Sequence, residues 1–230
     1  MIGFIGAMEV EVKQLVAELE NRSSETLAGM EFHKGTLGGK EVIIVKSGIG
    51  KVNAAICTEI LALRYGVDAV INTGIAGSLR AEINIGDIVL STDALQHDMD
   101  ATGFGYKPGV IPQMKESTFA ADERLRRLAA EVCRREIPEI GVHEGRVVSG
   151  DQFISDKEVK NRLIREFDGY CCEMEGAAIA QGAYLNGIPF LIIRAISDKA
   201  DDSATMDYPT FERQAIEHSV KLVKALVAAM

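Results

Sequence analysis

Short apolar stretches rich in β-branched residues alternate along the chain with segments in which apolar residues recur every three or four positions. Uninterrupted apolar stretches are typical of strands covered on both faces, because a strand with one face in water alternates apolar and polar residues. Strands are expected at residues 2–5, 42–45, 69–72, 88–90, 147–148 and 190–196. Their alternation with helices predicts an α/β fold with a mixed, mostly parallel, twisted sheet and helices on both faces.

The segments between these strands predict amphipathic helices, in which the apolar residues share one face. These faces comprise Val12, Leu15, Val16 and Leu19; Ile56, Ile60, Leu61 and Leu63; Leu125, Leu128, Ala129 and Val132; and Ile216, Val220, Val223 and Val227. We expect the last helix to begin at Asp207, which suits a helix cap, with Pro209 in its first turn.

Two segments depart from this alternation. Residues 31–46 predict an antiparallel hairpin, because two strand-like runs flank Gly38 and Gly39. Residues 91–117 fit no regular element and contain aromatic residues, prolines and several glycines. A loop of that length is usually functional or disordered, and its aromatic residues favour a function over a pocket or across a subunit contact.

Length and composition suit one globular domain over residues 1–230. Of the 230 residues, 47% are apolar, and neither a linker nor an internal repeat divides the chain. The formal net charge of −9 disfavours nucleic acid as a partner, because phosphate backbones repel an acidic surface. A polyanionic substrate is disfavoured in the same way, unless a local basic pocket overrides the mean field.

We expect a cytoplasmic protein without metal or cofactor. The spacing of the cysteines (Cys57, Cys133, Cys171 and Cys172) fits neither a zinc site nor a redox pair, so free buried thiols are expected. The first residues lack the basic start and long apolar run of a signal peptide, and no apolar run is long enough to span a membrane. The histidines have no metal-binding spacing, and the acidic string Asp198, Asp201 and Asp202 favours a solvated loop over a cation site.

Ligands of open α/β sheets bind at the carboxyl ends of strands, on the loops that lead into helices. Here the specific loops are residues 6–9, 47–51, 72–78, 171–175 and 197–198. The second loop superficially resembles a phosphate-binding P-loop, but its first position is Val45 and Val52 follows Lys51, where Gly and Ser or Thr are required. The glycines instead suit close approach of the backbone to a small ligand.

Three carboxylates near these loops match the needs of N-glycosidic bond cleavage. The leaving base must gain a proton, the ribose must be held, and a water must be activated on the far face. Asp198, Glu175 and Glu11 can supply these roles, with no cation expected nearby to seat an inorganic anion. Asp198 follows an apolar strand, so burial is expected to raise its pKa and suit it to act as an acid. Taken alone, Asp198 also suits a helix cap or a surface carboxylate, and Glu11 suits the positive end of a helix dipole.

Taken together, seven strings resemble the 5′-methylthioadenosine/S-adenosylhomocysteine nucleosidases, within the nucleoside phosphorylase superfamily. They are IGAMEVEV (5–12), SGIGKVNAA (47–55), INTGIAG (71–77), GDIVLSTDALQHDMDATGFGY (86–106), VSGDQFI (148–154), EMEGAAIA (173–180) and RAISDKAD (194–201). The resemblance runs nearly end to end. It implies a nucleoside phosphorylase-like fold and hydrolysis of 5′-methylthioadenosine and S-adenosylhomocysteine to adenine and the 5′-thioribose.

The resemblance also implies roles for individual residues. Asp198 matches the residue that protonates adenine at N7 and accepts a hydrogen bond from the 6-amino group, and Glu11 matches the one that activates the attacking water. Glu175 matches the carboxylate that grips the 2′- and 3′-hydroxyls. Ser197 and Arg194 match residues that support the acid and the water site.

Further positions match the substrate-binding surface of the family. Met174 matches a residue packed against the ribose, Phe153 a ring stacked on adenine, and Ile154 a residue whose backbone reads the edge of the base. Met8, Ile49 and Tyr208 match the apolar lining near the ribose and the 5′-thio group.

The resemblance further implies a homodimer. Phe104 and Pro112 match residues that reach the 5′ pocket of the neighbouring subunit, so the loop at residues 91–117 is expected to complete the partner's active site. Ile75 departs from the pattern, because some relatives carry a small polar residue there. A hydroxyl contact to the ribose from this position is therefore not expected.

Hydrolysis is favoured over phosphorolysis because a phosphate site needs converging cations and donors. The regions where phosphorylases carry arginines and a serine contain Glu9, Glu11, Asn72 and Ile75 here. Two alternatives stay open: a phosphorylase or a nucleosidase for another 5′-substituted adenosine, such as 5′-deoxyadenosine or an aminofutalosine-type compound, and a non-catalytic adenosine-binding protein on the same scaffold.

Overall fold

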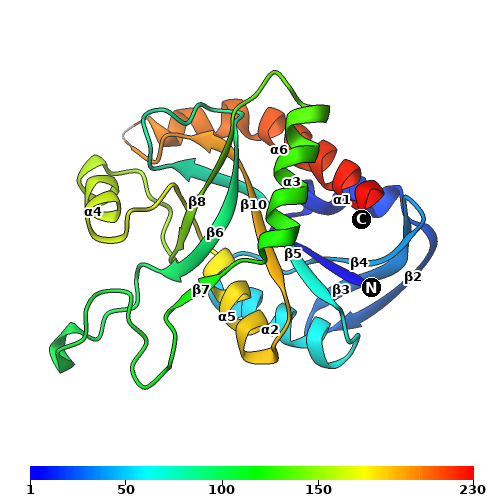
Figure 1. Ribbon diagram of the computed structural model, residues 1–230, viewed down its shortest axis with the longest axis horizontal. Coiled ribbons are helices and arrows are strands. Elements are labelled where there is room, and N and C mark those ends of the chain that lie inside the picture. The colour runs from blue at the N-terminus through cyan, green and yellow to red at the C-terminus, as the bar shows by residue number, and fades with distance from the viewer. Residues whose placement is uncertain (202) are drawn as a thin grey trace.

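The computed structural model describes residues 1–201 and 203–230, and these form a large sheet between two layers of helices (Figure 1). The strands are β1 (Ile2–Gly6), β2 (Glu20–Leu27), β3 (Met30–Leu37), β4 (Lys40–Lys46), β5 (Ala69–Ser78), β6 (Ile88–Gln96), β7 (Thr118–Ala120), β8 (Val142–Ser149), β9 (Cys171–Glu173) and β10 (Phe190–Asp198). The helices are α1 (Glu9–Ala17), α2 (Lys51–Leu63), α3 (Glu123–Glu136), α4 (Lys157–Phe167), α5 (Gly176–Asn186) and α6 (Ala204–Ala229), with a short 3₁₀ helix at Thr102–Phe104.

The sheet closes on itself along part of its width. Strands follow in the order β10-β6-β8-β9-β5, and β5 pairs with β10 to complete a ring. From β5 the sheet continues through β1, β4, β3 and β2. Strand β1 lies parallel to β4 and β5, and β5 lies parallel to β10. Strands β6 and β9, however, run antiparallel to β10 and β5, and β2, β3 and β4 form an antiparallel meander.

The predicted α/β class with helices on both faces is confirmed, but the sheet is not mostly parallel. It is mixed and partly closed, with antiparallel pairings as frequent as parallel ones among the described residues. The sequence pattern failed here because ring closure and flanking helices cover both faces of a strand whatever its direction. An antiparallel strand such as β6 is then as apolar as a parallel one.

Helices α1, α3 and α6 cover one face of the sheet, and α2 and α5 cover the other (Figure 1). On the first side, Leu15 of α1, Leu125 of α3 and Val223 of α6 pack into one core with strand residues. On the second side, Cys57 and Leu61 of α2 join a separate core. Residues of β1 and β5 belong to both cores and residues of β10 to the first, so packing positions the loops at the carboxyl ends of these strands.

Several elements differ from the predictions in extent. Strand β5 continues through the glycine-rich stretch to Ser78, and β6 continues to Gln96, so the irregular loop covers residues 97–117. The predicted hairpin around Gly38 and Gly39 is confirmed as β3 and β4. Strand β2 was not predicted, because this edge strand is polar and mostly exposed, without apolar alternation.

The start of the last helix was predicted incorrectly. Helix α6 begins at Ala204 with Ser203 at the N-cap, so Asp207 lies in its first turn and Pro209 lies within the helix. Ser203 Oγ lies 2.6 Å from Asp207 Oδ2 and 2.9 Å from Asp201 Oδ1, so its one hydroxyl proton bonds to either carboxylate at a helix start one turn earlier than expected.

Among the described residues, no helix combines the length and apolarity needed to cross a membrane. All four cysteines are buried free thiols.

Candidate active site

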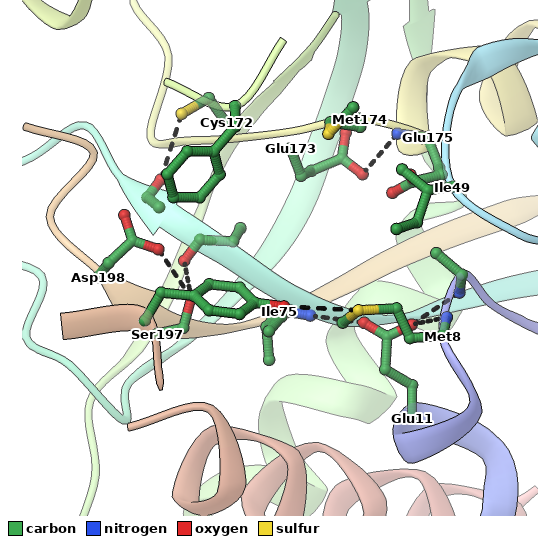
Figure 2. A pocket seen from close by; sticks show the side chains of 15 residues that line it. Met8, Glu11, Ile49, Ile75, Cys172, Glu173, Met174, Glu175, Ser197 and Asp198 are labelled. Atoms are coloured by element: carbon green, nitrogen blue, oxygen red, sulfur yellow. Dashed lines mark hydrogen bonds between the residues drawn. The ribbon is translucent and has the colours of Figure 1, made fainter. Parts of the chain in front are cut away.

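One cavity of about 390 Å³ opens at the carboxyl ends of β1, β5 and β10 (Figure 2). It is lined by Ala7, Met8, Glu11, Ile49, Ile75, Ala76, Gly77, Phe153, Cys172, Glu173, Met174, Glu175, Ser197, Asp198 and Tyr208. Four carboxylates thus border a mostly apolar space. Figure 2 shows Asp198 on one side of this space, with Glu11 and Glu175 on the other.

Glu11 combines a structural and a site position. It is the third residue of α1, and its Oε2 accepts from the backbone N–H groups of Ala7 at 2.6 Å and Met8 at 2.9 Å. Its Oε1 accepts from the N–H of Ile75 at 3.3 Å, so the side chain ties α1 to β5. Burial raises the pKa of Glu11, while Arg194 and the three backbone donors lower it. Glu11 therefore both stabilises the start of α1 and lines the cavity.

Asp198 is the last residue of β10 and is not a helix cap, because α6 begins only at Ala204. Its Oδ2 accepts from the Ser197 hydroxyl at 2.8 Å, and its Oδ1 accepts from the N–H of Ala200 at 2.7 Å. Burial raises the pKa of Asp198 above its ordinary value, although both hydrogen bonds act in the opposite direction. The environment suits a proton donor, as expected from the apolar strand that precedes it.

Glu175 caps the start of α5 and reaches back to the glycine loop before α2. Its Oε1 accepts from the N–H of Gly50 at 2.8 Å. Gly50 has φ of 96°, a left-handed conformation that aims its N–H at the carboxylate and that other residues adopt only with strain. Burial first, and then the negative charge of Glu173, raises the pKa of Glu175 to about 7.

Arg194 lies beneath these carboxylates with 1% of its surface exposed. Its Nη2 donates to Asn72 Oδ1 at 2.5 Å and to Glu173, and lies 3.8 Å from Glu175 Oε2. Arg194 thus places a cation beside the carboxylates, whereas the prediction concerned a cation that could seat an inorganic anion. The guanidinium is nevertheless paired with a carboxylate rather than free to receive an anion.

The apolar residues predicted near the ribose and the base also meet in this cavity. Met8, Ile49, Ile75 and Met174 line it, as do Phe153 and Tyr208. The rings of Phe153 and Tyr208 pack edge to face with centroids 5.9 Å apart. Phe153 is 51% exposed and Ile49 is 54% exposed, which places both at the mouth.

Four predicted residues lie outside the cavity lining: Arg194, which lies beneath the carboxylates, and Ile154, Phe104 and Pro112. Ile154 borders a small adjoining pocket of about 40 Å³ together with Phe153 and Asp198. Phe104, which is 88% exposed, and Pro112 lie in the loop at residues 97–117, which projects from the body of the molecule (Figure 1). Neither contributes to the cavity of its own chain, so their expected contact with a partner subunit stays a prediction.

The sequence interpretation missed Glu173 and Cys172, both of which line the cavity. Glu173 precedes Met174 in the string EMEG, and its role depends on hydrogen bonds to residues distant in sequence. Cys172 lies beside it on β9, and its thiol donates to the carbonyl of Gly77 at 3.7 Å. Strand alternation gave no signal for this pair, because it directs neighbouring side chains to opposite faces, whereas Cys172 and Glu173 both line the cavity.

Within the described part of the chain, no cluster of three or more His, Cys, Asp or Glu side chains is arranged to hold a metal ion. Asp202, part of the acidic string considered above, lies outside the described residues. Asp201 instead accepts from Lys160 at 3.3 Å and from Ser203. The chemistry this cavity supports is proton transfer at buried carboxylates.

Comparison with known proteins places these features in context. The model of the phosphorylase superfamily matches residues 1–228. A 5′-methylthioadenosine/S-adenosylhomocysteine nucleosidase of Shewanella halifaxensis is 44% identical over 227 residues, covering 98% of this chain and 98% of that protein. The crystal structure of the Neisseria meningitidis nucleosidase in complex with methylthio-immucillin-A has a TM-score of 0.95 at 37% identity, covering 100% of this chain and 99% of that one. Futalosine hydrolase of Helicobacter pylori has a TM-score of 0.94 at 35% identity, covering 100% and 97%.

Proposed function

Because this chain belongs to the 5′-methylthioadenosine/S-adenosylhomocysteine nucleosidases of the phosphorylase superfamily, we propose that it hydrolyses the N-glycosidic bond of both nucleosides. It is an N-glycosyl hydrolase that releases adenine and the 5′-thioribose. The observation that carries this proposal is the convergence of Glu11, Glu175 and Asp198 on one buried cavity.

Asp198 acts as the general acid. Burial raises its pKa above the ordinary value, which favours the protonated form, and Ser197 and the N–H of Ala200 fix its orientation. As the bond between C1′ and N9 breaks, its electron pair moves into adenine, which gains the proton of Asp198 at N7. The same carboxyl group accepts from the 6-amino group, which favours adenine over 6-oxopurines.

Glu11 acts as the general base on the other side of the ribose. A water attacks C1′ of the oxocarbenium-like sugar and transfers a proton to Glu11. Burial raises the pKa of Glu11, which makes its ionised form a stronger base. Glu175 holds the 2′- and 3′-hydroxyls with its carboxylate, and Arg194 supports the water site.

The apolar lining determines how the nucleoside lies. Phe153 stacks on adenine, the backbone of Ile154 reads its edge, and Met174 packs against the ribose. Contacts to the ribose and the 5′-thio group come from Met8, Ile49 and Tyr208. Ile75 provides an apolar wall near Glu11 rather than a hydroxyl contact.

Electrostatics favour water over phosphate as the nucleophile. Glu11 and Glu175 line the ribose side of the cavity, and an inorganic dianion there would face both. The only cation among the described lining and supporting residues, Arg194, is held by Glu173 and Asn72. A neutral water carries no such penalty.

A second substrate class is a nucleoside with another 5′ substituent. The likeness to futalosine hydrolase favours this candidate, because that protein has a closely similar fold over the full chain. Its substrate would use the same acid and base and differ only at the apolar 5′ end of the cavity.

Residues 1–230 form one catalytic domain in this proposal, and two copies form a homodimer in the cytoplasm. The exposed Phe104 in the projecting loop supports the dimer, because a large apolar side chain in water indicates a contact surface. Buried free thiols agree with a reducing compartment.

The deciding experiment is incubation of the purified protein with 5′-methylthioadenosine in phosphate-free buffer, with chromatography of the products. We expect adenine and 5-methylthioribose. Release only in the presence of phosphate, with formation of a ribose 1-phosphate, would identify a phosphorylase. Binding without release would identify a non-catalytic binding protein. Parallel assays with S-adenosylhomocysteine, 5′-deoxyadenosine and aminofutalosine rank the 5′ substituents.

A further inference from the structure

Glu173 is the most heavily hydrogen-bonded carboxylate of the site. Its Oε1 accepts from the Ser149 hydroxyl, and its Oε2 accepts from Arg194 and from the N–H of Glu175 at 3.2 Å. The N–H of Gly176 donates to both oxygens, at 3.0 and 2.8 Å. Only 8% of Glu173 is exposed, so the protein itself uses both of its oxygens.

This arrangement decides which carboxylate pairs with Arg194. Three acidic side chains, Glu11, Glu173 and Glu175, surround one buried guanidinium. Glu173 contacts it directly, whereas Glu175 Oε2 stays 3.8 Å from Nη2. Ser149 fixes Glu173 in turn, because its hydroxyl donates to the carboxylate and accepts from the N–H of Ala177 at 2.7 Å.

We propose that Glu173 is a positioning residue, which holds Arg194 in a direct ion pair and thereby leaves Glu175 and Glu11 available to the ribose and the water. The proposal rests on the hydrolytic function given above. A carboxylate in a close ion pair with arginine is a poorer hydrogen-bond acceptor and a weaker base. By occupying Arg194, Glu173 therefore protects the two carboxylates that act on substrate.

The charge of Glu173 also acts on its neighbours. Glu175 is faced by Glu173 from β9, Arg194 from β10, Glu11 from α1 and the N–H of Gly50 before α2. Removing the negative charge of Glu173 lowers the pKa of Glu175, because the ionised form of Glu175 is no longer repelled. Arg194, once released, lowers it further. His97, beyond β6, also experiences the charge of Glu173 and belongs among the groups that respond.

The test is the isosteric variant Glu173→Gln, assayed for adenine release between pH 5 and 9. The acid limb of kcat/KM reports groups of the free enzyme that must be ionised. We expect this limb to move to lower pH by roughly one pH unit. We also expect kcat to fall about 10- to 100-fold as Arg194 turns toward Glu175. A variant with wild-type kcat and an unmoved acid limb would overturn the proposal.

Two further variants separate positioning from a general loss of structure. Glu144→Gln is the control. It removes the charge of a partly exposed ion pair with Arg126 (2.9 Å) near the start of β8, at the end of the strand away from Ser149, and should leave kcat and the pH profile unchanged. Glu173→Asp keeps the charge but withdraws the carboxylate from Arg194, so kcat should fall while the acid limb moves less than in Glu173→Gln. If Glu173→Gln does not fold, this variant decides the matter, and wild-type kcat in Glu173→Asp refutes positioning.

Titration of ¹³C-labelled glutamate carboxyl groups by NMR reads the pKa of Glu175 without catalysis. A wild-type protein that releases no adenine would end the hydrolytic proposal. A pKa of Glu175 that is equal in wild type and Glu173→Gln would instead end the inference about Glu173. The two failures are therefore distinguishable.

Discussion

In the proposed mechanism, Asp198 donates the proton that makes adenine a leaving group, so its removal has the largest expected effect of any single side chain. Asp198→Asn keeps the shape of the side chain but provides no acidic proton. We expect kcat to fall about 10²- to 10⁴-fold, the usual contribution of a general acid, with a correctly folded protein. Adenine release in phosphate-free buffer measures the effect.

The matched control is Asp156→Asn. Asp156 caps α4 by accepting from the N–H groups of Glu158 and Val159, and it lies on the exposed surface. This variant should change neither the stability of the helix, because Asn caps a helix about as well as Asp, nor kcat. Near-normal turnover in Asp198→Asn would remove Asp198 from the mechanism.

Glu175 should show a trade-off between stability and activity. Its pKa is about 7 in the folded protein and near 4.5 when exposed, so the folded state binds its proton more tightly. The stability that this proton confers is complete below pH 4.5 and is lost as pH rises through about 7. Glu175→Gln removes the titratable group and therefore removes this loss of stability at high pH.

We therefore expect Glu175→Gln to be more stable than wild type by about 1 to 2 kcal/mol at pH 8, with little difference at pH 4.5. The same variant should lose activity, because a neutral amide grips the ribose hydroxyls less well. Thermal unfolding at the two pH values and steady-state kinetics test both parts. Equal stability differences at both pH values, or unchanged rate and affinity, would contradict this account of Glu175.

For single residues, the sequence indicated the site where a carboxylate lies on a loop that follows a strand. The positions of Asp198, Glu11 and Glu175 at one cavity could be predicted from strand-end loops and from the family resemblance. Glu173 could not, because its partners Ser149 and Arg194 come from other strands. One signal was available: an arginine within the apolar run 190–196 requires a buried acidic partner.

Strand β5 shows how a glycine permits the site to form. A Cβ at Gly74 would clash with Arg194 Nη1 and lie 2.5 Å from Glu11 Oε1. Gly74→Ala should therefore displace both side chains. We expect a fall in kcat of about 10²-fold, because catalytic groups misplaced by about 1 Å commonly lose that much. Steady-state adenine release measures it.

Gly66→Ala provides the contrast for Gly74→Ala. Gly66 has φ of 59° in open space after α2, so alanine there adds backbone strain without crowding the cavity. It should lower Tm while leaving kcat unchanged. If Gly74→Ala likewise lowers Tm but leaves kcat unchanged, close packing at β5 does not position Glu11 and Arg194.

Apolar periodicity located the buried face of α3, but in α2 only Leu61 of the predicted face is buried, because Ile56 and Leu63 are exposed. Apolar periodicity does not fix element boundaries. They were not predictable where polar contacts decide the boundary. Helix α6 starts early because Ser203 bonds to Asp207, a contact that competes with the preference of Pro209 for a first turn. Strand β2 pairs with β3 through the backbone ladder and one side-chain hydrogen bond between Ser24 and His33, and its polar residues gave no apolar alternation as a signal.

For the whole molecule, the sequence predicted the α/β class but not the closure of the sheet. Closure depends on β5 pairing with both β9 and β10, which lie about 100 residues or more further along the chain. Apolar patterning reports that a strand is covered, and it does not report which strands are neighbours or in which direction they run.

The proposed dimer makes a prediction about shared active sites. Phe104 is 88% exposed in the projecting loop and does not line the cavity of its own chain. If it completes the 5′ pocket of the partner, Phe104→Ala should raise KM for 5′-methylthioadenosine about 10-fold, as expected for loss of one aromatic contact. Tm should stay close to that of the wild type.

Mixing two impaired variants then tests whether the site is shared. A subunit with Phe104→Ala keeps its own Asp198, and a subunit with Asp198→Asn keeps the Phe104 that it lends to its partner. In a mixed dimer, one pocket therefore contains both intact residues.

After subunit exchange, adenine release at low substrate concentration should exceed the sum of the two separate variants and approach half of the wild-type rate per mixed dimer. Sedimentation velocity and tagged subunits establish that exchange has occurred. Additive activity despite exchange would mean that Phe104 acts within its own chain or not at all, because only a contact across the subunit boundary allows one defective subunit to repair the other.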